Sequence, residues 1–172
     1  EFRLYCETVS LSCVRVGLFI ALVEIAGRFA RAYEGVEIDV DIDMELEETA
    51  AALPEEHVLS LARIFQEAAS NSVRHGGARF IQVELHKEGD LLRFSVEDDG
   101  SGFDAYAYVG TDFEELRTTG HRGLANINER VRLLRGTMRI SSRPGKGCLI
   151  EILFPNPPLP GEDSPSLGQA SS

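Results

Sequence analysis

The sequence has few cysteines and few basic residues, and both shortages exclude classes of protein. Its three cysteines, Cys6, Cys13 and Cys148, are odd in number and lack a C-x-x-C spacing. They therefore indicate neither a disulfide framework nor a zinc site, and a reducing, intracellular compartment is the simpler interpretation. Acidic residues outnumber basic ones and leave a net charge of −11. This balance disfavours a non-specific nucleic-acid binder and a peripheral membrane protein, which both need a cationic face.

Long apolar runs are also missing. The most apolar stretch, residues 16–26, is interrupted by Gly17 and Glu24 and is too short to span a membrane. Its apolar positions recur at helical spacing, which predicts an amphipathic core helix. No signal peptide is readable, and the first residue is Glu1 rather than Met. We expect a cytoplasmic domain, without direct membrane contact, that is part of a longer protein.

The apolar pattern predicts an α+β fold. Helices are expected at 14–34, 54–75 and 124–136, and strands at 36–42, 80–86, 91–98, 137–142 and 147–154. The strands arrive largely as hairpins, which favours a two-layer sandwich with helices on one face of a mainly antiparallel mixed sheet. Residues 37–56 carry many acids and neither Lys nor Arg. We interpret this run as a solvated edge, with an acidic docking surface as the alternative.

Three segments are expected along the chain. The globular domain should span residues 14–155. Residues 1–13 would be an N-terminal extension or the end of an upstream linker. Residues 156–172 are rich in Pro, Ser and Gly, which predicts a disordered tail.

Asp98 ends a predicted strand whose face is otherwise apolar. A carboxylate directed to that side needs a hydrogen-bond donor, which the amino group of a ligand would supply. A turn cap, or fraying of the strand end into solvent, is the alternative. Gly100 and Gly102 follow at once and permit close approach of the backbone to a ligand, although tight turns use the same residues.

A polar helix face provides the second group of candidates. Glu67, Asn71, Arg74 and His75 lie within two turns on one side of the predicted helix. A carboxylate and a carboxamide one turn apart, with cationic or titratable groups beyond, suit a hydrated Mg²⁺ that carries phosphates. An ordinary solvated helix face is the alternative.

The third group surrounds the start of the last helix. Gly120, His121, Arg122, Gly123 and Leu124 combine two glycines with a helix N-terminus, where backbone N–H groups favour anions. A P-loop and a dinucleotide-binding fingerprint are both absent from the sequence. A flexible glycine loop without a ligand is the alternative.

The order and spacing of these groups resemble the ATP-binding domain of bacterial two-component sensor histidine kinases. Residues 65–75 (FQEAASNSVRH) resemble the N-box, 96–103 (VEDDGSGF) the first glycine box, 120–124 (GHRGL) the second, and 145–148 (GKGC) the closing element. The resemblance covers about residues 17–155 and extends to the superfamily that includes gyrase and mismatch-repair ATPases. It implies a Bergerat-type ATPase fold. The N-box pattern and the short lid before the helix are typical of the nitrate-sensor type.

The resemblance also implies roles for individual residues. Asp98 would accept from the adenine amino group, and Asn71 would hold Mg²⁺. Glu67 would lie near the metal as the catalytic base or as a water-positioning group. Arg74 and His75 would approach phosphate, and Gly100 and Gly102 would shape the pocket. The mobile lid would be formed by Gly120, His121, Arg122 and Gly123, with Leu124 and Cys148 as further nucleotide-binding residues.

Two positions depart from the family pattern. Cys148 stands where the family usually has Thr, and a thiol is the weaker hydrogen-bond donor. Asp99 stands where Asn is commoner, which adds negative charge near the nucleotide. We expect nucleotide binding to survive both changes.

The phosphoacceptor histidine of such kinases has no counterpart in this chain. The resemblance implies that the chain is the catalytic domain of a protein histidine kinase, with its own dimerisation and phosphoacceptor domain and a response regulator as partners. A serine kinase of the anti-sigma-factor type and a non-catalytic nucleotide-binding docking module are the alternatives. No nucleic-acid partner is expected.

Overall fold

The computed structural model describes residues 17–105 and 122–157, and within them five strands form one mixed sheet. The strands follow the order β1-β2-β3-β5-β4 across the sheet. β1 pairs with β2 in parallel, and the other neighbours are antiparallel. The bounds are β1 (Glu37–Ile42), β2 (Phe80–Glu88), β3 (Leu91–Asp98), β4 (Thr137–Ser142) and β5 (Cys148–Pro155).

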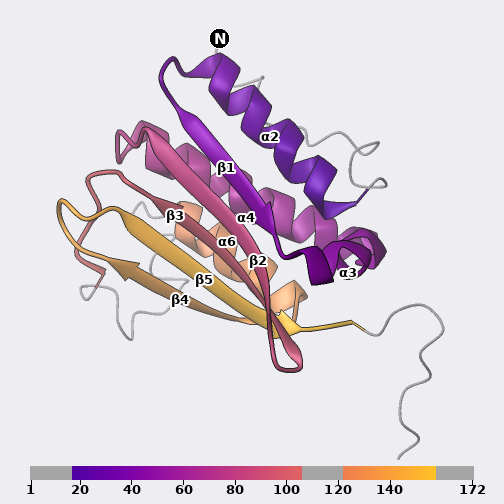
Figure 1. Ribbon diagram of the computed structural model, residues 1–172. Coiled ribbons are helices and arrows are strands. Elements are labelled where there is room, and N and C mark those ends of the chain that lie inside the picture. Colours follow the sequence, from indigo (N-terminus) through magenta and orange to yellow (C-terminus); the bar gives the residue numbers. More distant parts are fainter. Residues whose placement is uncertain (1–16, 106–121, 158–172) are drawn as a thin grey trace, which may run out of the picture.

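Helices α2 (Leu18–Ala32), α4 (Glu55–Arg74) and α6 (Arg122–Leu133) cover one face of this sheet (Figure 1). The α+β sandwich expected from the sequence is therefore confirmed, and the helix and strand bounds agree to within a few residues. The expectations for residues 1–13 and 158–172 lie outside the described part of the chain. Asn156 is described, and its amide donates to the Asp90 carbonyl in the β2–β3 turn (3.1 Å).

The acidic run contains structure that the sequence did not predict. A 3₁₀ turn, η2 (Met44–Leu46), and a short helix, α3 (Glu47–Ala52), follow β1. Leu46 and Ala50 are buried, while the acids of α3 face solvent. The solvated edge is thus the exposed side of a small amphipathic element. The helix was not predicted because it has too few apolar positions to show helical spacing in the sequence.

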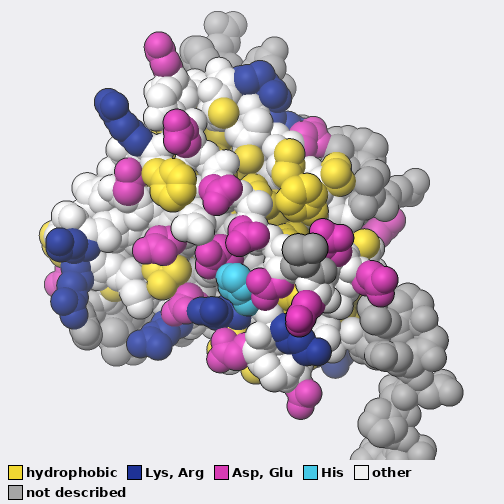
Figure 2. Space-filling view, viewed as in Figure 1, with side chains coloured by type: hydrophobic (Ala, Val, Ile, Leu, Met, Phe, Trp, Pro, Cys, Tyr) yellow, Lys and Arg dark blue, Asp and Glu magenta, His cyan; other side chains and the backbone are white. Residues whose placement is uncertain are grey.

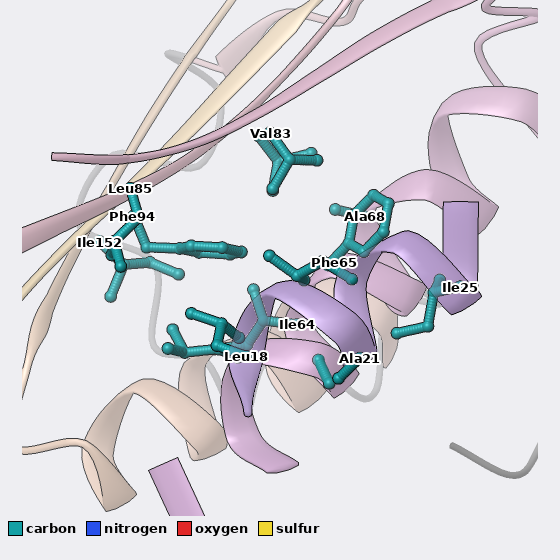
Figure 3. Close-up of a cluster of buried hydrophobic side chains, with 14 of the residues drawn as sticks. Leu18, Ala21, Ile25, Ile64, Phe65, Ala68, Val83, Leu85, Phe94 and Ile152 are labelled. Atoms are coloured by element: carbon teal, nitrogen blue, oxygen red, sulfur yellow. The ribbon is translucent and has the colours of Figure 1, made fainter. Parts of the chain in front are cut away.

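The core lies between the helices and the inner sheet face. In this core, α4 contributes Ile64, Phe65 and Ala68, which lie beside Val83 of β2 and Phe94 of β3 (Figure 3). The alternation of side chains along a strand explains which residues are buried, since Ile81, Val83 and Leu85 of β2 are buried while their neighbours are not. Full burial of a side chain such as Phe65 stabilises the fold by about 1.5–3 kcal/mol. This core holds α4 rigidly against the end of β3.

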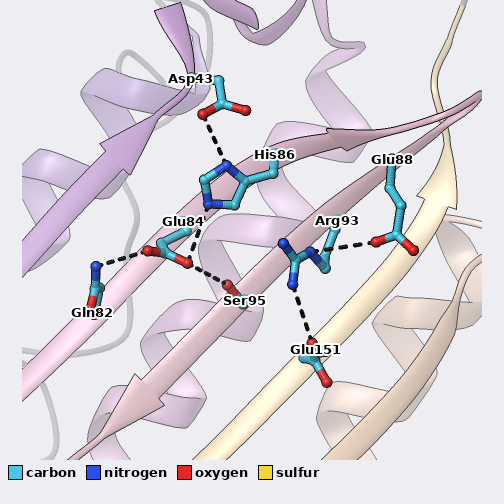
Figure 4. Close-up of polar contacts among 8 residues, drawn as sticks. All are labelled: Asp43, Gln82, Glu84, His86, Glu88, Arg93, Ser95 and Glu151. Atoms are coloured by element: carbon cyan, nitrogen blue, oxygen red, sulfur yellow. Dashed lines mark hydrogen bonds and ion pairs between the residues drawn. The ribbon is translucent and has the colours of Figure 1, made fainter.

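The outer face of the sheet is polar, and acidic and basic side chains gather over it (Figure 2). His86 lies between two carboxylates: Nδ1 is 2.9 Å from Asp43 Oδ1, and Nε2 is 3.3 Å from Glu84 Oε2 (Figure 4). The hydrogen bond to Asp43, with a further contribution from Glu84, raises the pKa of His86. Arg93 lies 3.5 Å from both Glu88 and Glu151. These pairs tie β2, β3 and β5 together on the solvent side.

Candidate functional site

A cavity of about 370 Å³ lies between α4, the adjoining ends of β3 and β5, and the first turn of α6. Its walls are mainly apolar, with Ala68, Val96 and Ile150 among the lining side chains. A few polar groups converge on it from different elements. Cavities of this size and character are typical of small-molecule sites.

One stripe of α4 forms a wall of the cavity. Ala68, Asn71, Ser72 and His75 line it, at the i, i+3, i+4 and i+7 positions that share one side of a helix. Ser72 is only 7% exposed, and Asn71 is half-buried. The polar face predicted from the sequence therefore lines the cavity at Asn71 and at His75, of which His75 is also exposed to solvent.

The carboxylate of Asp98 lines the same cavity at the end of β3. Its Oδ2 accepts a hydrogen bond from Ser72 Oγ (2.6 Å), and its Oδ1 accepts one from the Gly100 amide (2.8 Å). The donor that the sequence required for Asp98 is thus provided by the protein itself. Each oxygen has a further lone pair, so the carboxylate keeps acceptor capacity toward the cavity.

The turn after β3 is tied to the turn that enters β5. Gly102 has φ +60°, and a Cβ atom there would lie 2.2 Å from the Arg143 carbonyl oxygen. Only glycine fits this conformation and this close approach. Ser142 Oγ accepts from the Phe103 amide (2.9 Å) and donates to the Gly147 carbonyl (2.7 Å). The two glycine-containing turns therefore form one fixed floor beside Asp98.

The first turn of α6 approaches the polar face of α4. A Cβ atom on Gly123 would lie 2.6 Å from Asn71 Nδ2 and 2.7 Å from Glu67 Oε1. Glycine therefore brings the backbone of a helix N-terminus over a carboxylate and a carboxamide. Leu124 follows and lines the cavity. Glu67 lies beside the cavity rather than in its wall.

The structure does not bring every candidate residue to the cavity. Arg74 does not line it, and its Nε donates to Tyr33 Oη at 3.2 Å. The phosphate contact that the resemblance implies for Arg74 has no support from this arrangement. Arg122 begins α6. Gly120 and His121 lie outside the described residues.

Cys148 lines the cavity directly across from Asp98 in the β3–β5 register. Burial, together with the nearby charge of Asp98, raises the pKa of the Cys148 thiol to about 12, although a hydrogen bond with Ser142 acts in the opposite direction. The side chain is therefore a neutral thiol at physiological pH. It contributes a small, weakly polar surface where the family usually presents a hydroxyl.

Asp99 serves the fold rather than the cavity, which it does not line. Its Oδ1 accepts from the amides of Arg79 (2.8 Å) and Phe80 (2.9 Å) at the start of β2. These bonds, the one from Phe80 first, lower the pKa of the Asp99 carboxyl. The charge that the sequence placed near a nucleotide is instead used to fix the turn after β3 against β2.

Sequence reasoning missed several residues of the site. Val96 and Ile150 line the cavity, but apolar residues on a strand face carry no signal that separates a cavity wall from the core. Phe103, in the irregular segment after β3, also lines it. Ser72 did leave a signal, since it is a hydroxyl on the otherwise apolar inward stripe of α4.

The cavity lies at the ends of β3 and β5, two inner strands of the mixed sheet, and comparisons with known proteins identify the family of the domain. Residues 56–158 match the family described as histidine kinase-, DNA gyrase B-, and HSP90-like ATPase. The chain belongs to this family, as an ATP-binding catalytic domain of the sensor histidine kinase kind. Among the described residues, no helix is both long and apolar enough to cross a membrane.

The relatives are sensor kinases. The chain is 35% identical over 132 residues to an uncharacterized sensor-like histidine kinase of Chloroflexus aurantiacus, a match that covers 76% of this chain and 20% of the relative. It is 34% identical over 99 residues to the signal transduction histidine-protein kinase/phosphatase DegS of Bacillus subtilis, with 56% and 24% covered. The sensor protein VraS of Staphylococcus aureus is 35% identical over 104 residues, with 60% and 26% covered. The chain thus spans about a fifth to a quarter of the length of these relatives.

Solved structures show the same fold at lower sequence identity. The histidine kinase domain of the blue-light activated histidine kinase from Erythrobacter litoralis has a TM-score of 0.63 at 20% identity, covering 81% of this chain and 61% of that one. The mycobacterial sensor histidine kinase MprB has a TM-score of 0.61 at 16% identity, covering 84% and 97%.

Proposed function

We propose that this domain binds ATP with Mg²⁺ in the cavity and donates the γ-phosphate to a histidine on a dimerisation domain elsewhere in the longer protein. From there the phosphoryl group would pass to a response regulator. The observation that carries the proposal is the arrangement of Asp98 and Asn71 at two places around one apolar cavity. The first can recognise a base, and the second can face phosphates.

The part of the cavity around Asp98 fits an adenine ring. Val96 and Ile150 supply apolar walls for its faces, and Asp98 supplies an acceptor for its amino group. Because Asp98 is held by two donors, its free acceptor sites have fixed directions before the ligand arrives. Such preorganisation lowers the cost of binding.

The residues around Asn71 and the first turn of α6 fit phosphates that share a magnesium ion. Glu67 and Asn71 converge on Gly123, and the amides of the first turn of α6 are suited to an anion. Within the described residues, no three His, Cys, Asp or Glu side chains cluster closely enough to hold a metal by themselves. The ion would therefore be shared between Asn71, Glu67, water and the phosphates, as is usual for magnesium.

The transfer step depends mainly on positioning. When bound, Mg²⁺ supplies charge neutralisation for the phosphates. Glu67 would accept a proton or orient the acceptor, and His75 contributes to the cavity wall beside Asn71. The relatives VraS and DegS, together with the N-box pattern, support the nitrate-sensor type of histidine kinase. A cytoplasmic location of this domain is part of the proposal.

Titration with a non-hydrolysable ATP analogue, with and without Mg²⁺, tests the site. We expect saturable binding that Mg²⁺ strengthens, and we expect Asn71→Ala to remove that strengthening. Asn126→Ala, at an exposed position of α6, is the matched control and should bind as the wild type does. Binding of the analogue with no magnesium dependence in the wild type would exclude the proposed metal role of Asn71.

The acceptor is tested in the full-length protein with labelled ATP. A phosphohistidine is labile in acid and stable in base, whereas a phosphoserine survives acid. Acid-labile label that passes to a response regulator supports the histidine kinase. Acid-stable label on a separate protein would favour the serine kinase of the anti-sigma-factor type.

A further inference from the structure

Ser72 lines the cavity beside Asp98 but is not among the site residues that the sequence predicted. Its Oγ lies 2.6 Å from Asp98 Oδ2 and 2.9 Å from the carbonyl oxygen of Ala68, one turn back on α4. Both neighbours are acceptors, and a serine hydroxyl has a single hydrogen to donate. The hydroxyl must therefore favour one of them.

The Asp98 carboxylate is a stronger hydrogen-bond acceptor than the Ala68 carbonyl. A hydroxyl-to-carboxylate bond of 2.6 Å is in the range of charge-assisted hydrogen bonds, which are roughly twice as strong as neutral ones. The Ala68 oxygen is already engaged in the backbone ladder of α4. If Ser72 donates to Asp98 instead, the Ala68 oxygen still has its helical donor and is not left unpaired.

Asp98 is consequently held by two elements at once. The Gly100 amide, in the turn after β3, donates to Oδ1, and Ser72, on α4, donates to Oδ2. A carboxyl group with a donor fixed on each oxygen cannot rotate freely. Each donor occupies one lone pair of its oxygen and leaves the remaining lone pair in a fixed direction. The group that faces the cavity is therefore an oriented acceptor.

We propose that Ser72 is a positioning residue that sets the base selectivity of the cavity, by holding Asp98 as an oriented acceptor for a 6-amino purine and against a 6-oxo purine. A 6-oxo group presents another acceptor to Asp98, so the two oxygens repel. Without the hydroxyl, Oδ2 loses its donor, and the carboxyl group can turn away from the direction that matches a 6-amino group. The inference rests on the proposed ATP site and deepens it.

Binding of three non-hydrolysable triphosphates to the purified chain tests this role. The adenosine analogue carries the 6-amino group, the inosine analogue carries the 6-oxo group, and the purine riboside analogue carries neither. We expect Ser72→Ala to weaken the adenosine analogue about tenfold. Binding of the purine riboside analogue should not change, and preference for adenosine over inosine should fall. Ser72→Thr keeps the hydroxyl and should restore the preference.

Ser60 offers a matched control, because it is a second buried serine of α4 (4% exposed) that does not line the cavity. Ser60→Ala should leave all three affinities unchanged. Ser72→Cys, nearly isosteric and a weak donor, should give the same pattern as Ser72→Ala and replaces it if the alanine variant does not fold.

The outcomes separate the two proposals. If Ser72→Ala or Ser72→Cys weakens the adenosine and purine riboside analogues equally, Ser72 has only a structural role and the inference fails while the ATP site stands. If the wild type binds none of the three, the ATP site itself fails.

Discussion

Gly123 lies directly against Asn71: a Cβ atom at Gly123 would be 2.6 Å from the side-chain nitrogen of Asn71. This closeness joins the N-terminus of α6 to the polar face of α4. The three side-chain atoms that a new Cβ would meet, two on Asn71 and one on Glu67, are at the ends of flexible side chains. They can move, but only by leaving the positions at which they would meet magnesium.

Gly123→Ala should therefore separate folding from binding. Alanine favours a helix over glycine by about 1 kcal/mol, so the stability of α6 should be kept or raised. Displacement of Asn71 and Glu67 should weaken Mg²⁺-dependent ATP binding about tenfold, which is about 1.4 kcal/mol. Thermal unfolding and nucleotide titration measure the two effects. Gly27→Ala, in the middle of α2, is the control and should leave binding unchanged.

Cys148 should be unreactive in the folded protein. A pKa of about 12 leaves very little thiolate at pH 8, and the thiolate is the reactive species. In a Cys6→Ser, Cys13→Ser background, its reaction with a disulfide reagent should be about a hundredfold slower than that of an exposed cysteine. Ser141→Cys, on the solvent side of β4 with Cys148→Ser added, provides that reference. Equal rates would contradict a half-buried, neutral thiol.

His86 should give the fold a pH-dependent stability. Its pKa is raised in the folded state by Asp43 and Glu84, so the protonated form is favoured there. The contribution is fully present below the unfolded pKa of about 6.5 and is lost as the pH rises through the raised folded pKa. The difference in free energy of unfolding between wild type and His86→Gln should be larger at pH 5.5 than at pH 8.

His57 is an internal comparison for that measurement. Burial lowers its pKa, so its neutral form is favoured in the folded state. Its contribution is present above the unfolded pKa and is lost as the pH falls through the lowered folded pKa. Urea unfolding of His57→Gln should show a pH dependence of opposite sign. The same sign for both variants would show that these environments are wrongly described.

Asp99 should matter for stability rather than for binding. Its two hydrogen bonds from the amides of Arg79 and Phe80 are exposed, so Asp99→Ala should cost about 1 kcal/mol. The lowered pKa of Asp99 means that this contribution is present above the unfolded pKa of about 3.9 and is lost as the pH falls through the folded value. Chemical unfolding at pH 7 and pH 3 checks both statements. A large loss of ATP affinity in a stable Asp99→Ala protein would contradict this role.

The sequence predicted the fold well where periodicity is strong. The alternation in β2 and β3 and the spacing in α4 follow from burial of one face, so their positions could be read directly. The short helix α3 could not, because six residues give too few turns to reveal a pattern. Local spacing also placed Asn71 and His75 correctly on one helix side.

The directions in which the site side chains point were harder to predict from the sequence. Arg74 is adjacent to His75 in sequence, yet its Nε donates to Tyr33 while His75 lines the cavity, because one step along a helix turns the side chain by about 100°. Asp99 beside Asp98 diverges for the corresponding reason at a strand end. The partner of Asp98 on α4 depends on how a helix packs on a sheet, which local sequence does not specify.

The central claim is that Asp98 recognises the base of a bound ATP, and titration of Asp98→Asn with a non-hydrolysable ATP analogue tests it most directly. Glu97→Gln, the neighbouring acid on the exposed outer face of β3, is the control for a lost carboxylate charge. We predict that Glu97→Gln binds as the wild type does, while Asp98→Asn, which keeps its shape and fold, binds at least tenfold more weakly. Equal affinity of Asp98→Asn and wild type would contradict the account.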